Sequence, residues 1–125
     1  MKKSVIKLTA KEEEVMTHFW QRGALFVREL LESYDEPKPH FNTLSTVVRG
    51  LEEKGCLSHR SYGSSYQYFA TISLDEFRAQ SLQGLIGKYY DNSIFSAVSA
   101  LVETKAISSE QLRELLTLVE KGEEQ

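Results

Sequence analysis

The sequence predicts a mainly α-helical protein with one small β-hairpin, and three observations support this fold class. Apolar residues recur at spacings of three and four in six separate stretches, as they do along helices with one buried face. Residues 57–71 instead contain two β-prone runs on either side of a turn cluster. The chain of 125 residues, 41% hydrophobic and 26% charged, suits one compact soluble domain or a small domain with an appendage.

The first helix is expected to begin after Thr9 and to end at Gly23. Thr9 and Glu12, in "LTAKEEEVMTHFW", match a capping box, in which each side chain accepts a hydrogen bond from the other residue's backbone N–H. The acidic residues 12–14 complement the positive end of the helix dipole. The expected apolar stripe consists of Val15, Met16, Phe19 and Trp20.

A short β-prone run and a short helix are expected next, within "ALFVRELLESYDEPKP". The helix passes through Leu30 and Leu31. Asp35, Pro37 and Pro39 close this segment, because neither proline fits comfortably within a helix.

The third helix, in "HFNTLSTVVRGLEEKG", has two different faces, and Gly55 is expected to stop it. Its apolar side chains should bury against the first two helices; they are Phe41, Leu44, Val47, Val48 and Leu51. The remaining arc carries Asn42, Thr43, Ser45, Thr46, Arg49 and Gly50. A solvent-facing arc usually carries Glu and Lys. This one is either an ordinary solvated face or a face that recognises a partner.

The hairpin is expected from the runs Leu57–Arg60 and Tyr66–Thr71, which the turn cluster "SYGSS" separates. A two-stranded hairpin is too small to be stable alone, so it must pack on the three helices before it. Three helices followed by a hairpin is the order of a winged helix-turn-helix domain. We assign residues 1–72 to this domain.

Residues 73–125 are expected to form three further short helices. Ser73 with Glu76 and Ser108 with Gln111 match capping boxes, and Ser93 is a start for the middle helix. Helices this short have too little interior for their apolar side chains, so we expect a second copy of the chain to cover them. Folding back onto the first domain is the alternative. The expected dimerisation residues are Leu82, Leu85, Ile86, Ile94, Phe95, Val98, Leu101, Leu112, Leu115, Leu116 and Val119.

The charge and the cysteine content limit the functions and the compartments that fit this chain. Residues 1–72 carry a net charge of +1 and residues 73–125 of −4, so the acidity of the −3 total lies in the second part. Cys56 is the only cysteine, which excludes an internal disulfide, and we expect it to be a core thiol in a reducing compartment. The sequence has no membrane-spanning run and no signal peptide, so we expect a cytoplasmic protein.

Catalytic and metal sites are not indicated. No Ser–His–Asp order, phosphate-binding glycine loop or apolar carboxylate pair is present, so we expect no enzyme activity. Three scattered histidines and one cysteine show no ligand spacing, so we expect no metal and no cofactor. His18 is expected on the surface, and His40 and His59 are candidates for phosphate contacts.

From about Leu8 to Glu120, the chain resembles the penicillinase-repressor (BlaI/MecI/CopY-type) family of transcriptional regulators. The resemblance rests on "LTAKEEEVMTHFW", "NTLSTVVRGLEEKG", "YQYFATIS" and "SSEQLRELLTLV", in this order and spacing. It implies a homodimer whose winged-helix domains bind a palindromic DNA operator and block transcription, with residues 73–125 as the dimerisation domain. In such families a membrane-bound sensor metalloprotease typically relieves repression by cutting the dimerisation domain. By position the cut would fall at Ala100–Leu101.

The arc of the third helix then has a DNA-reading interpretation, because short polar side chains suit phosphates and base edges and Arg can bind guanine in a bidentate manner. The expected DNA contacts are Asn42, Thr43, Ser45, Thr46 and Arg49, with Arg60 and Tyr62 from the wing. Where the family typically has Lys near position 42 and Arg near positions 45 and 50, this chain has Asn42, Ser45 and Gly50. Fewer cations imply a different operator and a shallower salt dependence.

Other positions also bear on the family resemblance and on the expected DNA binding. Arg60, His59 and Lys54 are candidates for part of the missing positive charge. The Asn–Phe pair at the family's cleavage site is absent, and so are the paired C-terminal cysteines of copper-sensing relatives. Two alternatives stay open: a winged-helix repressor regulated by a small ligand, and a winged-helix protein-interaction module that binds no DNA.

Overall fold

The computed structural model describes residues 6–124, which form two compact units. The first unit ends at Ser81 and the second begins at Leu82. Each is considered by itself. The helix α4, Leu74–Tyr89, contributes its first turns to the first unit, so that unit extends beyond residue 72.

The helix α1, Ala10–Arg22, has the expected capping box. The backbone N–H of Glu12 donates to Oγ1 of Thr9 at 3.2 Å, and the N–H of Thr9 donates to Oε1 of Glu12 at 2.9 Å. The helix ends at Gly23, whose φ of +86° is a conformation that glycine adopts without a steric penalty. Both ends of α1 are therefore set by local sequence.

The predicted hairpin is confirmed, and it belongs to a sheet of three strands in the order β1-β3-β2. The additional strand is β1, Leu25–Phe26, which lies immediately before α2, Val27–Glu32. Leu25 pairs with Tyr68 and Phe26 with Gln67 in antiparallel register. β1 lies within the β-prone run expected before the second helix, but so short a run does not show which strand it pairs with.

The helix α3, Phe41–Glu53, buries Leu44, Val48 and Leu51 as expected, and Val47 is half-buried. The expectation that Phe41 is buried was wrong, because its side chain is 49% exposed. Phe41 is the first residue of α3, and its ring lines an open groove instead of the core. The apolar spacing alone could not show that α3 begins about one turn before its first buried residue, Leu44.

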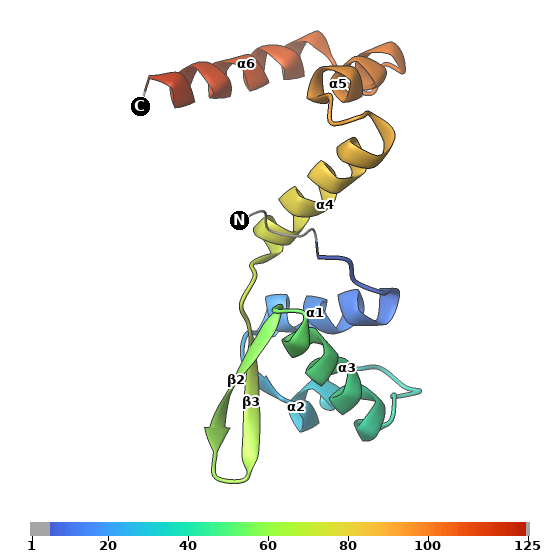
Figure 1. Cartoon of the computed structure of the whole chain (residues 1–125), viewed down its shortest axis with the longest axis vertical. Coiled ribbons are helices and arrows are strands. Elements are labelled where there is room, and N and C mark those ends of the chain that lie inside the picture. The colour runs from blue at the N-terminus through green and yellow to red at the C-terminus, as the bar shows by residue number, and fades with distance from the viewer. Residues whose placement is uncertain (1–5, 125) are drawn as a thin grey trace. The chain divides into compact units, whose positions relative to one another are not determined.

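The hairpin consists of β2, Leu57–Tyr62, and β3, Ser65–Ala70, and its tip protrudes from the first unit (Figure 1). Compared with the predicted runs, β2 extends two residues further toward the turn, and β3 begins one residue earlier and ends one residue earlier. The turn contains Gly63 at a φ of +62°. Side chains alternate across the sheet, so Leu25, Leu57 and Tyr68 face the core. Arg60, Tyr62 and Gln67 lie on the other face.

The core of the first unit joins α1, α2 and α3 to the sheet and to α4. Trp20 of α1 donates a hydrogen bond from Nε1 to the carbonyl oxygen of Ile72 at 2.9 Å, and its ring lies 5.3 Å from that of Phe77. The first turns of α4 are thereby fixed to the winged part of the unit. The buried apolar residues are Val15, Met16, Phe19, Leu25, Leu30, Leu44, Val48, Leu51, Cys56, Leu57, Tyr68, Ile72 and Phe77.

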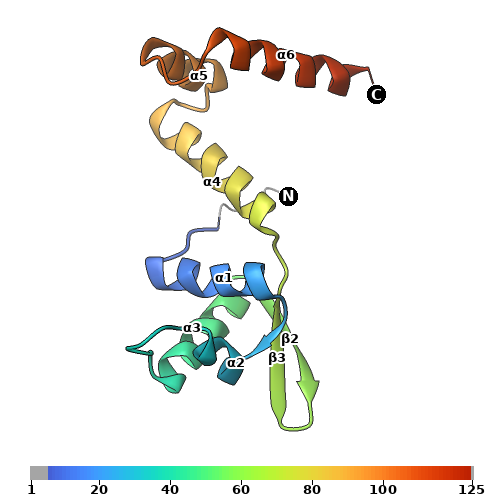
Figure 2. The same cartoon turned by 180° about the vertical axis from the view of Figure 1, so that it is seen from behind.

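The second unit contains the rest of α4, then α5, Ile94–Glu103, and α6, Ser109–Glu123. The predicted caps are confirmed: Ser93 accepts from the N–H of Ser96, and Ser108 and Gln111 form a capping box. The helices extend from one another and do not close into a bundle (Figures 1 and 2). Within residues 82–124 no side chain is buried.

Candidate nucleic-acid interface

The exposed arc of α3 carries all five helix residues that were expected to contact DNA. Asn42, Thr46 and Arg49 are exposed, and Thr43 and Ser45 are half-buried at its edges. The arc carries no acidic side chain before the last two residues of the helix, 52 and 53. Phosphate groups would therefore meet no negative charge along about the first three turns.

Two of these polar residues are bonded within the helix. Oγ1 of Thr46 donates to the carbonyl oxygen of Asn42 at 2.9 Å. The guanidinium of Arg49 donates to Oγ1 of Thr46 at 3.4 Å, a long hydrogen bond. The hydroxyl proton of Thr46 is thus used by the backbone, whereas Arg49 retains other N–H groups that can bind a base or a phosphate.

The N-terminus of α3 is open to an external acceptor. Its N-cap residue, His40, makes no side-chain capping hydrogen bond, and the first turn contains no acidic residue. The backbone N–H groups of that turn have no intrahelical acceptors, and the helix dipole makes this end positive. The same features favour a phosphate there over a carboxylate of the chain itself.

The wing residues Arg60 and Tyr62 lie on the outer face of the hairpin. The guanidinium of Arg60 lies 5.0 Å from the ring centre of Phe69, and the ring of Tyr62 packs edge-on at 5.9 Å against Phe26. Strand alternation places both on the face opposite to His59. Arg60 and Tyr62 therefore lie on the same face of the hairpin, and His59, which contacts the end of α3, lies on the other face.

His59 joins the hairpin to the end of α3. Its Nδ1 lies 2.8 Å from Oε2 of Glu52 and donates to that carboxylate, and its ring stacks on Tyr66 at 4.3 Å. This pair fixes the position of the wing relative to α3. The sequence suggested His59 as a source of positive charge for DNA, and in the structure its ring is paired with Glu52.

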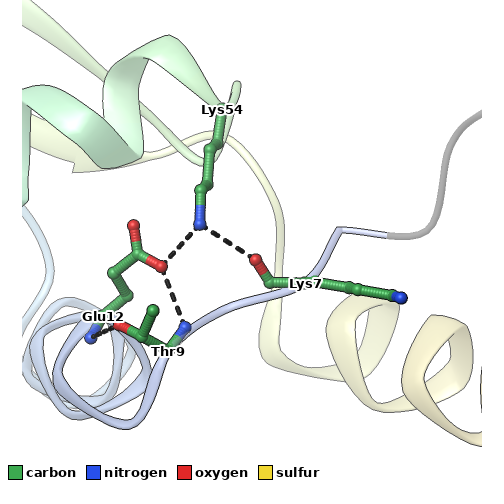
Figure 3. Close-up of polar contacts among 4 residues, drawn as sticks. All are labelled: Lys7, Thr9, Glu12 and Lys54. Carbon is green, nitrogen blue, oxygen red and sulfur yellow. Dashed lines mark hydrogen bonds and ion pairs between the residues drawn. The ribbon is translucent and has the colours of Figure 1, made fainter.

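Lys54 also has partners within the first unit, as Figure 3 shows. Its Nζ lies 2.6 Å from Oε1 of Glu12 and 3.0 Å from the carbonyl oxygen of Lys7. Burial alone would raise the pKa of Glu12, but the hydrogen bonds from Lys54 and from the backbone of Thr9, with the charge of Lys54, hold it below its ordinary value. Lys54 thus connects the end of α3 to the start of α1.

A residue that sequence reasoning missed is Arg28, at the second position of α2. It lines a groove between α2, the start of α3 and the tip of the hairpin, with Phe26, Val27, Phe41, Ser64, Ser65, Tyr66 and Tyr68. Arg22, Arg49, Arg60 and Arg78 each have a hydrogen-bonding, ionic or ring partner, whereas the side chain of Arg28, in the described part of the first unit, makes no hydrogen bond, ion pair or ring contact. No sequence signal could have found it, because the groove is made by three elements that are apart in the chain.

Residues 6–124 contain no group of three or more His, Cys, Asp or Glu side chains that could hold a metal ion. Cys56 is fully buried, as predicted, and burial raises the pKa of its thiol. Across the helices described, none combines the length and the apolar character that crossing a membrane requires. His18 lies half-buried with its ring 4.5 Å from that of Tyr34.

The residues expected to dimerise remain uncovered within one chain. Phe95 is 83% exposed and Ile94 64%. Three of the eleven, Ile86, Val98 and Leu112, are half-buried and the others are exposed. The expected cleavage residues, Ala100 and Leu101, lie inside α5.

Comparison with known proteins agrees with this architecture. The family model described as penicillinase repressor matches residues 8–121. The chain is 22% identical over 119 residues to a penicillinase repressor of Bacillus licheniformis, covering 94% of this chain and 93% of that protein. It is 21% identical over 122 residues to the methicillin resistance regulatory protein MecI of Staphylococcus epidermidis, covering 97% and 99%. An uncharacterised 16.5 kDa protein of Latilactobacillus sakei is 27% identical over 122 residues, covering 94% and 83%. The resemblance seen in the sequence is confirmed, and the chain belongs to the penicillinase repressor family.

Proposed function

We propose that the protein is a sequence-specific DNA-binding repressor of transcription. The observation that carries the proposal is the acid-free polar arc of α3, exposed beside a hairpin in a member of a repressor family. A helix that enters the major groove needs short hydrogen-bonding side chains and an arginine, and this arc carries both. The names of the relatives link them to penicillinase and to methicillin resistance, so resistance genes are the first candidates for its targets.

In this proposal α3 lies in the major groove. Asn42, Ser45 and Arg49 contact base edges, and Thr43 and Thr46 contribute contacts from the same arc. Arg60 and Tyr62 on the wing contact the phosphate backbone, and Arg28 contacts it from α2. Glu52 and His59 keep the wing and α3 in register, so that both can contact one duplex.

We further propose that the repressor is a homodimer on a palindromic operator. The support is the apolar surface of residues 82–124, which one chain leaves uncovered. An isologous interface between two copies would bury this surface, and it would present two α3 helices to half-sites about one helical turn apart. Bound in this way, the dimer would occlude a promoter.

Release by proteolysis is the mechanism we propose for induction, at Ala100–Leu101, with a membrane sensor metalloprotease as the partner. Both residues are helical in α5, so this segment must unwind before a protease can bind it in an extended form. Co-expression with the cognate sensor protease should yield two fragments upon induction. An intact chain on an induced operator would contradict cleavage and favour a small ligand as the inducer.

The experiment that tests the proposed function is the selection of bound duplexes from a random DNA pool by the purified chain at moderate salt. We expect a palindrome whose half-sites lie about one helical turn apart. Recovery of no duplex, even at about 50 mM salt where non-specific binding is strong, would contradict DNA binding and support a protein-interaction module.

A further inference from the structure

Phe41 is an aromatic side chain exposed where a core residue was expected. It is 49% exposed, and its ring lines the groove that Arg28 and the tip of the hairpin share. Tyr66, which also lines this groove, is likewise 49% exposed. Single exposed apolar residues are ordinary on protein surfaces, but two half-exposed aromatic side chains that line one groove indicate a surface that contacts a partner.

The position of Phe41 places it among the residues proposed to read DNA. It is the first residue of α3 and precedes Asn42. Because residues four apart lie on the same side of a helix, Ser45 is its neighbour one turn on, and Arg49 follows one turn later. The N-terminal residues of a recognition helix are those that reach base edges.

The charge around Phe41 also suits a nucleic acid. The residues that line its groove include one cation, Arg28, and no acidic side chain. The remaining lining residues with polar groups carry hydroxyls, which can donate to phosphate. An aromatic ring with no polar group of its own, in such surroundings, would face an apolar atom of a base.

We propose that Phe41 determines specificity by packing against the C5 methyl group of a thymine in each half-site. This inference rests on the proposed function. Thymine is the DNA base that presents a methyl group in the major groove, and Phe is a side chain suited to contact it. Phe41 can form no hydrogen bond, so the methyl group itself would distinguish thymine from the other bases. Tyr66, which ends in a hydroxyl, is better suited to phosphate.

The test uses the full chain and the palindrome recovered from the random pool. Each thymine is replaced in turn, in both half-sites, by deoxyuridine, which removes the methyl group and preserves base pairing. For the wild type we expect one position where replacement weakens binding about fourfold per half-site, the value of burying one methyl group. Thymines outside the half-sites, replaced in the same way, serve as the control and should have no effect.

The variants then assign the effect to Phe41. Phe41→Ala should weaken binding to the thymine duplex by at least fourfold per half-site. It should also no longer distinguish deoxyuridine from thymine at the sensitive position. Phe41→Leu preserves an apolar contact and should retain part of the sensitivity, with a melting temperature near that of the wild type. If Phe41→Ala is less stable, the comparison of Phe41→Leu with the wild type takes its place.

Three outcomes would overturn the inference. One is a wild type that is insensitive to every replacement, and another is a Phe41→Ala variant that keeps the full wild-type sensitivity. The third concerns duplexes in which a cytosine is replaced by 5-methylcytosine. If this replacement strengthens binding while no thymine replacement has an effect, the contact is with the methyl group of a modified cytosine. In all three the wild type still binds its palindrome, so the proposed function stands. Failure to bind any duplex would overturn both.

Discussion

The ammonium nitrogen of Lys54 lies 2.6 Å from Oε1 of Glu12, so the residue that caps the end of α3 is paired with the first turn of α1. The same carboxylate accepts from the backbone N–H of Thr9, which starts α1 (Figure 3). One side chain therefore supports both the capping box and the packing of α3 against α1. The position of the proposed DNA-binding helix depends on this junction.

Replacing Glu12 separates its two roles. Glu12→Gln keeps an oxygen for the capping box but removes the charge, so it should lower the free energy of unfolding by about 0.5–1 kcal/mol. Glu12→Ala removes both and should lower it by about 1–2 kcal/mol. Urea denaturation of the two variants measures the difference. Equal losses would show that the capping-box hydrogen bond of residue 12 contributes nothing, and an unchanged stability of Glu12→Gln would show the same for the charge.

The contribution of the Glu12 charge should depend on pH. Because the pKa of Glu12 is lower in the folded chain than its ordinary value of 4.5, the stabilisation is present above that value and is lost as the pH falls through the folded pKa. The difference in unfolding free energy between the wild type and Glu12→Gln should therefore be constant near neutral pH and vanish in acid. Urea denaturation at pH 7 and at a series of pH values below 4.5 tests this, and a difference that does not decline as the pH falls below 4.5 would contradict it.

Arg28→Gln should weaken binding to specific and non-specific duplexes by similar factors, because a phosphate contact carries no sequence information. The slope of log K against log salt should become shallower by about one unit per half-site. Arg78→Gln is the matched control, since Arg78 lies near Asp75 in α4 and lines no part of the groove. An unchanged slope for Arg28→Gln would exclude the contact.

Arg49→Ala should weaken binding to the selected palindrome by about 1–3 kcal/mol if its guanidinium contacts guanine. The loss should be confined to duplexes with guanine at one position of the half-site. Titration of duplexes that differ at single base pairs measures this. A similar loss on every duplex would reassign Arg49 to the phosphate backbone.

Phe95→Glu should convert the proposed dimer to a monomer and weaken operator binding, because it places a charge in the proposed apolar interface. Ser96→Glu adds the same charge at the next position of α5, which is exposed and polar, and should leave the dimer intact. Sedimentation of both variants at several concentrations gives the result. A dimeric Phe95→Glu variant would move the interface elsewhere.

The helices of the first unit were predictable because their signals are local. Thr9 with Glu12 and the stripe Leu44, Val48 and Leu51 are properties of neighbouring residues, and the structure confirms them. Ser108 with Gln111 predicted the start of α6 in the same way. Capping and periodicity therefore sufficed to order the elements and to choose the fold class.

The features that the sequence did not show depend on contacts between distant residues. Lys54 and Glu12 are 42 positions apart, and Lys54 in the sequence is an ordinary surface cation. β1 becomes a strand only because β3 lies beside it. Phe41 fits the apolar spacing but extends beyond the core, and Arg28 lies beside the hairpin tip only in the folded chain. Tertiary packing decided each of these cases.

The most direct test of the central claim compares the affinity of the purified chain for its selected palindrome with that for a scrambled duplex of the same composition, at physiological salt. The account predicts tighter binding to the palindrome by about a thousandfold or more, the ratio typical of specific DNA-binding proteins. It also predicts that Arg49→Ala removes much of that ratio. Equal affinities for the two duplexes would contradict sequence-specific recognition by α3.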